Sequence, residues 1–306
     1  HSRRERMLAL NRDAARFFHQ CLKAAGGQPA RDYIDKRQIS PQMVTAFGLG
    51  FAPDTWTSLC DAMEHRGYTR LELVQAGLAR ESKKGSGIYD TFRNRLMFPV
   101  IDVRGSVIGF SGRILGDGEP KYMNSPETLV FNKSRNLFAL NLAKKSKSGY
   151  IILSEGNIDV VSLHQAGFDS AVASLGTSLT PEQARLLARY TGEIILAYDN
   201  DAAGQKAAQR AIGILEKLDL KVRVLQMQGE KDPDAFLKAR GPDAFRALIL
   251  GSADQIQFRL AQVEGQFDLQ SDDGRLGFLK AATELVSSLP GALEREIYAG
   301  RVAEKA

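Results

Sequence analysis

The middle of the chain alternates short apolar runs with segments of helical periodicity. The apolar runs cover residues 150–155, 171–175, 194–199 and 222–227, and the helical segments lie between them at 158–166, 181–190 and 202–218. Apolar runs of this length, bounded by Gly or Asp, are typical of buried strands in a parallel sheet. The alternation predicts a compact α/β domain of about 80 residues.

The first half of the chain has a mixed pattern that predicts a smaller α+β unit. Apolar positions recur at helical spacing through residues 3–25 and stop at Gly26-Gly27. Ser40 and Pro41 supply an N-cap and a first-turn proline for a short helix, which Gly48 ends. Further elements are predicted as helices at 56–66, 69–76 and near 135–145, and as two strands joined by a turn at 96–102 and 106–113.

The last part of the chain reads as helices, for example at 234–238 and 276–289. A polar stretch rich in Lys and Ser, residues 144–149, is typical of a domain boundary. We therefore predict three units: a basic, mixed α+β subdomain over 3–148, an α/β domain with parallel strands over 149–231, and a helical subdomain over 232–306.

The composition is that of an ordinary soluble protein, since 43% of the 306 residues are hydrophobic and 25% are charged. No run approaches the roughly 18 apolar residues of a membrane span, so we expect a cytoplasmic protein without membrane contact. Cys21 and Cys60 match no zinc motif and are expected to be buried free thiols. The start at His1, without an initiator Met, indicates a piece of a longer protein.

Charge is unevenly distributed along the chain. Residues 1–149 carry 24 Lys and Arg against 14 Asp and Glu, a formal +10, whereas the remainder carries 17 against 22, a formal −5. A basic half joined to an acidic half suits a phosphate polymer and metal-dependent chemistry on it. The alternative is ordinary solvated surface charge.

Carboxylates gather after three of the predicted strands: Glu155 and Asp159, Asp199 and Asp201, and Asp232 and Asp234. Ligands of parallel sheets bind beyond the carboxyl ends of the strands, so we expect the six side chains to converge, without an Arg partner. Like charges this close resist ionisation unless a cation neutralises them, and oxygen-only donors favour Mg²⁺ or Mn²⁺. The alternative for each carboxylate is helix capping, and this alternative is strongest for Asp234.

The same motifs resemble the Toprim fold of topoisomerases and primases. They are Glu155-Gly-x-x-Asp159, the strand 171–177, Asp199-Asn-Asp201-x-Ala-Gly204 and Asp232-Pro-Asp234. Other motifs are similar to those of the bacterial replicative primases of the DnaG type, namely Lys121-Tyr122-x-Asn124 with Phe131-x-Lys133, and Phe92–Pro99 with Gly109–Arg113. The resemblance runs from about residue 8 to the end. Two departures are Asn200, where many relatives have Gly, and Lys231, which replaces an acidic residue and should slightly weaken metal affinity.

The resemblance implies an RNA polymerase core that copies single-stranded DNA into short RNA primers by two-metal nucleotidyl transfer. It implies Glu155, Asp199 and Asp201 as primary ligands of Mg²⁺ or Mn²⁺, with Asp159, Asp232 and Asp234 completing the second site. It also implies a basic ridge that faces the metals, made of Arg37, Arg113, Lys121 and Lys133, with Tyr122 and Asn124 in the loop between. These six residues would hold template or nucleotide.

The resemblance further implies partners and missing parts. We expect single-stranded DNA, ribonucleoside triphosphates and an RNA primer as partners, and a monomeric protein. The zinc-binding module and the helicase-binding domain of the family are expected to lie outside this chain, so that no zinc binds here. A Toprim nuclease, a topoisomerase-related enzyme and a non-catalytic DNA-binding module remain alternatives. Trp56 and the Phe positions are expected in the core.

Overall fold

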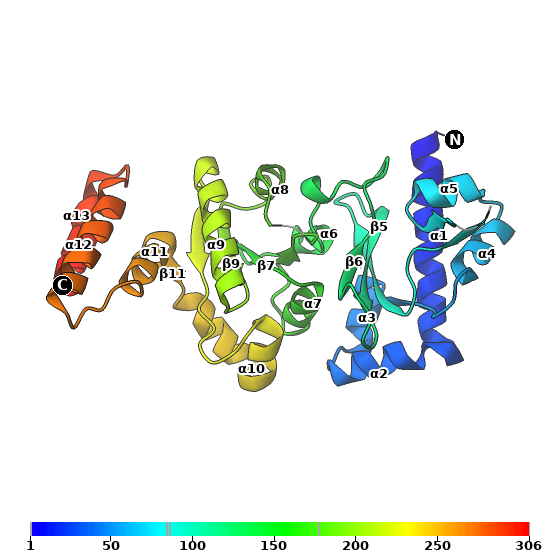
Figure 1. The fold of residues 1–306 in the computed structure, drawn as a ribbon, viewed down its shortest axis with the longest axis horizontal. Helices are drawn as coiled ribbons and strands as arrows, with labels where there is room; N and C mark the ends of the chain where they lie inside the picture. Colours follow the sequence, from blue (N-terminus) through cyan, green and yellow to red (C-terminus); the bar gives the residue numbers. More distant parts are fainter. Residues whose placement is uncertain (1, 84, 86, 177, 306) are drawn as a thin grey trace.

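The computed structural model describes residues 2–83, 85, 87–176 and 178–305, so His1 and Thr177 of the motifs above lie outside it. Three parts follow one another along the long axis of the molecule (Figure 1). The N-terminal part lies at one end, a central sheet between helices lies in the middle, and a pair of helices lies at the other end.

The N-terminal part is a small antiparallel sheet packed against helices. Strands β1 (Gly50–Ala52), β4 (Arg95–Ile101), β5 (Val107–Ile114) and β6 (Tyr122–Asn124) form this sheet in the order β1-β4-β5-β6, and β2 (Ala79–Glu81) pairs with β3 (Ile88–Asp90). The helices are α1 (Arg3–Lys23), α2 (Gln28–Lys36), α3 (Pro41–Phe47), α4 (Ser58–His65) and α5 (Arg70–Gln75). The predicted β4–β5 hairpin is confirmed. The predicted α3 is confirmed too, since the Ser40 hydroxyl accepts a hydrogen bond from the Met43 N–H and Gly48 ends the helix at φ 63°.

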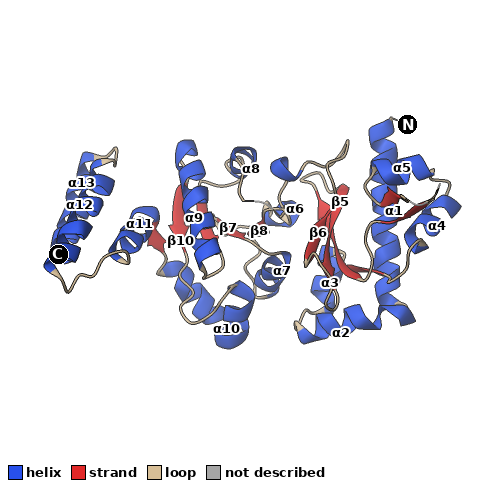
Figure 2. Cartoon of the chain, in the orientation of Figure 1, coloured by secondary structure: helices blue, strands red, loops and turns tan. Residues whose placement is uncertain are grey.

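The central sheet has the order β11-β10-β9-β7-β8. It lies in the middle of the molecule with helices around it (Figure 2). Its strands are β7 (Ile151–Ser154), β8 (Ala171–Ala173), β9 (Glu193–Ala197), β10 (Lys221–Val224) and β11 (Ala253–Asp254), and the helices between the first four are α7 (Asn157–Gln165), α8 (Pro181–Leu187) and α9 (Ala202–Leu215). The four predicted strands pair in parallel, which confirms the α/β fold. Strand β11 adds an antiparallel edge that was not predicted, because two residues leave no periodic signal.

Hydrophobic residues cover both faces of the central sheet. Ile152 and Ile195 face a core shared with α7 and the N-terminal part, whereas Leu153 and Leu196 face a second core under α9. The first core runs across the predicted boundary at residue 149. The helix α6 (Leu140–Ala143) precedes that boundary, and the bridge between Phe138 and Ala173 already joins the preceding segment to the central sheet. The three-unit division stays a prediction.

The C-terminal region is helical, as predicted. It contains α10 (Pro233–Leu250), which is kinked at Gly241 (φ 83°), and then α11 (Gln255–Glu264), α12 (Asp272–Ser287) and α13 (Ala292–Lys305). Helices α11, α12 and α13 share a separate small core. None of the helices in the described residues is long and apolar enough to cross a bilayer.

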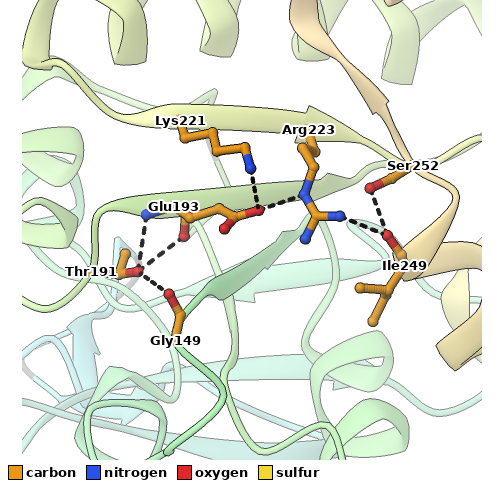
Figure 3. A network of polar contacts seen from close by, with 7 residues as sticks. All are labelled: Gly149, Thr191, Glu193, Lys221, Arg223, Ile249 and Ser252. Atoms are coloured by element: carbon orange, nitrogen blue, oxygen red, sulfur yellow. Dashed lines mark hydrogen bonds and ion pairs between the residues drawn. The ribbon is translucent and has the colours of Figure 1, made fainter.

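A polar network ties the end of α10 to the amino ends of β9 and β10 (Figure 3). The Arg223 guanidinium donates to the Glu193 carboxylate at 2.5 Å and to the Ile249 carbonyl at 2.9 Å. The Thr191 hydroxyl donates to the Gly149 carbonyl at 3.2 Å in the same network. These contacts fix the C-terminal end of α10 against β9 and β10.

Two expectations about buried residues need correction. Trp56 is 64% exposed and is not part of the core. Cys60 is a buried free thiol as expected, but Cys21 is only half-buried.

Candidate active site

A cavity of about 230 Å³ opens where the carboxyl ends of β7 and β9 face the N-terminal sheet. Five of the six predicted carboxylates line it: Glu155, Asp159, Asp199, Asp232 and Asp234. Two residues of the predicted basic ridge, Arg37 and Lys121, line it as well, together with Tyr122 and Asn124 of the intervening loop. We call this space the carboxylate cavity. It joins acidic residues of the central and C-terminal parts to basic residues of the N-terminal part, whereas Asp201, Arg113 and Lys133 do not line it.

The acidic wall is built on neighbouring parallel strands. Glu155 follows β7 and Asp199 follows β9, and these two strands pair directly. The Asp199 backbone N–H donates to the Glu155 carboxylate at 2.9 Å. The Asp234 backbone N–H donates to the Asp159 carboxylate at 3.1 Å, which ties the start of α10 to α7. Strand order and backbone hydrogen bonds therefore hold the carboxylates on one side of the cavity.

Burial and repulsion make two of these carboxylates, Asp159 and Asp199, reluctant to ionise. Burial, followed by the negative charges of Glu155 and Asp232, raises the pKa of Asp199 to about 6. Burial, followed by the charge of Asp232, raises the pKa of Asp159 well above its usual range. The ammonium of Lys231 opposes this effect, because its charge lowers the pKa of Asp199. A divalent cation would relieve the same repulsion.

Asp201 and Asp232 cap helices, as the alternative reading of the sequence allowed. The Asp201 carboxylate accepts from the Gly204 N–H at 2.7 Å at the start of α9, and the Asp232 carboxylate accepts from the Ala235 N–H at 2.8 Å at the start of α10. Gly204 is required here, because a Cβ on it would lie 2.0 Å from the Asp199 carbonyl oxygen. Each capping carboxylate keeps a second oxygen for another partner.

Asp234 departs most from the expectation that the cluster lacks a cationic partner. Its side chain is 5% exposed and accepts from Arg37 at 3.1 Å and from Lys238 at 2.8 Å. The Ser162 hydroxyl also donates to it. The partner Arg37 lies 197 positions away in the sequence, so no spacing rule could reveal it. These contacts make Asp234 a neutralised link between the N-terminal part and α10.

The carboxylate oxygens of the cavity are suitable ligands for a hard divalent cation, although these side chains do not converge on one point. Within the described part of the chain, no three or more His, Cys, Asp or Glu side chains form a group that could hold a metal ion. The carboxylates nevertheless share one cavity, offer only oxygen, and include two with raised pKa values. Mg²⁺ and Mn²⁺ prefer such ligands.

The basic wall is organised around the ring of Tyr33. The Arg113 guanidinium lies 4.5 Å from the centre of this ring and that of Arg37 lies 5.4 Å from it. Arg113 is therefore held beside the wall without lining the cavity. Asn124 lies against the segment that follows β8, because a Cβ on Gly176 (φ 71°) would lie 2.4 Å from its amide nitrogen.

Lys133 lies apart from this wall. It belongs to the short 3₁₀ helix Lys133–Arg135, and its backbone carbonyl accepts from the Gln183 amide at 2.9 Å. Its side chain does not line the carboxylate cavity.

A surface cluster that the sequence reading missed lies on the N-terminal part. The Arg93 guanidinium stacks 3.9 Å from the centre of the exposed Trp56 ring, and Tyr89 meets the same ring edge-on at 5.6 Å. An exposed tryptophan beside an arginine is typical of surfaces that stack nucleic-acid bases. The only sequence signal was that Trp56 is the single Trp of the chain. Its large apolar ring was expected in the core.

Three known protein families match successive parts of the chain. Residues 17–144 match the N-terminal domain of the DNA primase catalytic core, residues 152–237 match a Toprim-like domain, and residues 256–306 match a domain described as the DnaB-helicase binding domain of primase. The last match corrects the expectation that the helicase-binding region lies outside this chain. The sequence reading missed it because the C-terminal helices carry amphipathic patterns without a recognisable motif.

Individual relatives agree with these matches. The chain is 39% identical over 302 residues to a DNA primase of Clostridium acetobutylicum, covering 98% of this chain and 50% of the relative. It is 38% identical over 280 residues to a DNA primase of Escherichia coli K12, covering 90% of this chain and 48% of the relative. The chain thus spans about half the length of the curated relatives it matches.

Solved structures cover the chain nearly end to end. The RNA polymerase domain of Mycobacterium tuberculosis primase DnaG, in complex with a double-stranded DNA oligomer with a 6-nucleotide overhang, matches with a TM-score of 0.88 at 34% identity, over 98% of this chain and 97% of that one. A DnaG primase catalytic domain bound to single-stranded DNA matches with a TM-score of 0.84 at 34% identity, over 99% and 96%. The chain therefore belongs to the bacterial DNA primase family and corresponds to its DnaG-type catalytic core.

Proposed function

We propose that this chain is the RNA polymerase core of a primase, which copies single-stranded DNA into short RNA primers from ribonucleoside triphosphates. The observation that carries the proposal is the carboxylate cavity, in which metal-binding oxygens face Arg37, Lys121 and Asn124 from another part of the chain. A cavity with acidic and basic walls can hold cations and phosphates at the same time. Family membership supports the same activity.

The residues of the site have two proposed roles, metal binding and phosphate binding. Glu155 and Asp199 are the proposed primary ligands of Mg²⁺ or Mn²⁺, together with Asp201, and Asp159, Asp232 and Asp234 complete or support the site. Bound divalent cations would lower the pKa of a primer 3′-hydroxyl and stabilise the pyrophosphate leaving group. Arg37 and Lys121 would hold phosphates by charge, with Tyr122 and Asn124 beside them.

The basic half of the chain is the proposed template surface. Arg113, held against Tyr33, and Lys133 extend the basic surface around the cavity, and the stacked pair of Trp56 and Arg93 offers a place for an unpaired base. The helices α11, α12 and α13 are the proposed helicase contact, because they fall within the family match for helicase binding. We further propose that the protein is cytoplasmic and acts as a monomer.

The experiment that tests this function is incubation with single-stranded template, the four ribonucleoside triphosphates and Mg²⁺ or Mn²⁺. Template-dependent RNA of a few nucleotides or more would support the proposal. Shortening of the template would instead show a Toprim nuclease, and retention of the template without any product would show a binding module.

A further inference from the structure

The side chain of Gln165 joins the central part of the molecule to the N-terminal part. Gln165 is the last residue of α7, and its amide donates to the Gln38 carbonyl at 2.7 Å and accepts from the Ser40 N–H at 2.8 Å. These two partners lie on either side of Ile39, in the turn between α2 and α3. One amide therefore holds both sides of a turn that is distant from it in the sequence.

The turn that Gln165 holds comes directly after Arg37, which is the C-cap of α2. Gln38 adopts a left-handed backbone conformation (φ 56°), and the Ile39 N–H donates back to the Ile34 carbonyl at 3.1 Å. This pattern ends a helix and reverses the chain direction. Ile39 is buried in the first core. The backbone that carries Arg37 is thus held by α2 on one side and by Gln165 on the other.

Helix α7 carries three polar side chains at intervals of three residues: Asp159, Ser162 and Gln165. Residues three apart are neighbours on a helix surface. The Asp159 carboxylate accepts from the Asp234 N–H at 3.1 Å, and the Ser162 hydroxyl donates to the Asp234 carboxylate. The Arg37 guanidinium donates to the same carboxylate at 3.1 Å. Helix α7 therefore contacts both members of the Arg37–Asp234 pair, the carboxylate through Ser162 and the turn after the arginine through Gln165.

The position of Arg37 matters because its guanidinium donates in fixed directions. It lines the carboxylate cavity and lies 5.4 Å from the centre of the Tyr33 ring. Arginine binds phosphate through a rigid fork of N–H donors, so the strength of binding depends on where this fork lies. Gln165 is not among the described residues that line the cavity, and it bonds to the backbone of the turn. Its influence on the cavity therefore passes through the backbone next to Arg37.

We propose that Gln165 is a positioning residue, whose amide holds the turn after Arg37 so that the guanidinium presents its N–H groups to phosphate in the carboxylate cavity. This inference rests on the proposed function. An amide suits this role because it donates and accepts at the same time. A side chain that only joined two parts of the fold would affect stability whatever residue stood at position 37. A positioning residue affects phosphate binding only while Arg37 is present.

The test measures binding of the Mn²⁺ complex of inorganic tripolyphosphate by calorimetry, with the whole chain. Gln165→Met keeps the length of the side chain and removes both hydrogen bonds. Gln75→Met is the matched control, because Gln75 is also an exposed last residue of a helix, α5. Methionine favours helices about as well as glutamine, so these variants are expected to fold. Gln165→Met is also measured together with Arg37→Gln, which removes the charge but can still donate to Asp234.

One neutral hydrogen bond is worth roughly two- to tenfold, so Gln165→Met should bind tripolyphosphate roughly three- to tenfold more weakly than the unmodified chain. Gln75→Met should bind it equally well. Arg37→Gln should bind it more weakly by itself, and adding Gln165→Met should then cause no further loss of affinity. Thermal unfolding should show the same small cost of Gln165→Met with either residue at position 37. During RNA synthesis, KM for ribonucleoside triphosphates should rise while kcat stays unchanged, because the lost contact binds substrate and transition state equally.

Three results would overturn the assignment: unchanged tripolyphosphate affinity in Gln165→Met, an equal further loss when Gln165→Met is added to Arg37→Gln, or unchanged affinity in Arg37→Gln itself. Failure of the proposed function looks different, because the unmodified chain would then make no RNA on a template. RNA synthesis by the unmodified chain, together with normal tripolyphosphate binding by Gln165→Met, would refute the role of Gln165 alone.

Discussion

The Asp199 charge should lower the stability of the metal-free protein, so its removal should raise stability. The pKa of Asp199 is raised to about 6 by burial and by repulsion from Glu155 and Asp232. A rise of about two pKa units corresponds to about 3 kcal/mol of unfolding free energy. Asp199 is only partly buried, and solvent screening reduces this to about 1–2 kcal/mol.

The sign of the pH dependence follows from the folded state having the higher pKa. The cost of the charge is fully present above about pH 6, fades as pH falls toward the unfolded value, and is absent below it. Asparagine has nearly the same shape as aspartate, and the backbone hydrogen bond from residue 199 to Glu155 would remain. Asp199→Asn should therefore raise the melting temperature by about 2–4 °C at pH 8 with a chelator present. The gain should be about half as large at pH 5.

Thermal unfolding followed by circular dichroism measures this difference. The matched control is Asp201→Asn, which removes an exposed charge and keeps the helix cap, since asparagine caps as well as aspartate. Its melting temperature should rise by less than that of Asp199→Asn, because Asp201 is the weakest of the listed negative charges that raise the pKa of Asp199. Added Mn²⁺ should stabilise the unmodified protein more than Asp199→Asn. A melting temperature for Asp199→Asn equal to or below that of the unmodified chain, at pH 8 without metal, would refute the repulsion argument.

Three further predictions concern the surroundings of the cavity. Asp234→Ala should lower the free energy of unfolding in urea by about 2–4 kcal/mol, because it leaves Arg37 and Lys238 without their buried partner; an unchanged midpoint would contradict this. Trp56→Ala should leave stability unchanged but weaken single-stranded DNA binding, measured by fluorescence anisotropy, by about 1–3 kcal/mol, and equal affinity would remove the stacking role. Lys121→Ala should reduce the slope of log affinity against log salt by about one, whereas an unaltered slope would place Lys121 away from phosphate.

Strands and helices whose formation depends on neighbouring residues could be predicted from the sequence. The four parallel strands were predictable because each apolar run is buried between two covered faces, and α3 was predictable from Ser40 and Gly48 at its ends. The helix α2 was missed because its nine residues include four charged ones and only two buried ones. The carboxylates that end strands could be foreseen as neighbours, since the ends of parallel strands meet at one edge.

Contacts between distant segments could not be read from the sequence. The pairing of Asp234 with Arg37 joins residues 197 positions apart, and no pattern near either residue encodes it. Asp201 follows the same motif as Asp199, yet it turns to cap α9 and does not line the cavity. Trp56 is exposed and stacks on Arg93, which lies 37 positions further along the chain.

The carboxylate cavity is the proposed site of metal-dependent RNA synthesis. The most direct test compares the unmodified chain with Glu155→Gln, measuring Mn²⁺ binding, template affinity and RNA product on the same preparations. Glu155→Gln should stay folded and bind template normally, lose Mn²⁺ affinity, and make less RNA by about a hundredfold or more. A folded Glu155→Gln protein with near-normal RNA synthesis would show that the carboxylate cavity is not the site of synthesis.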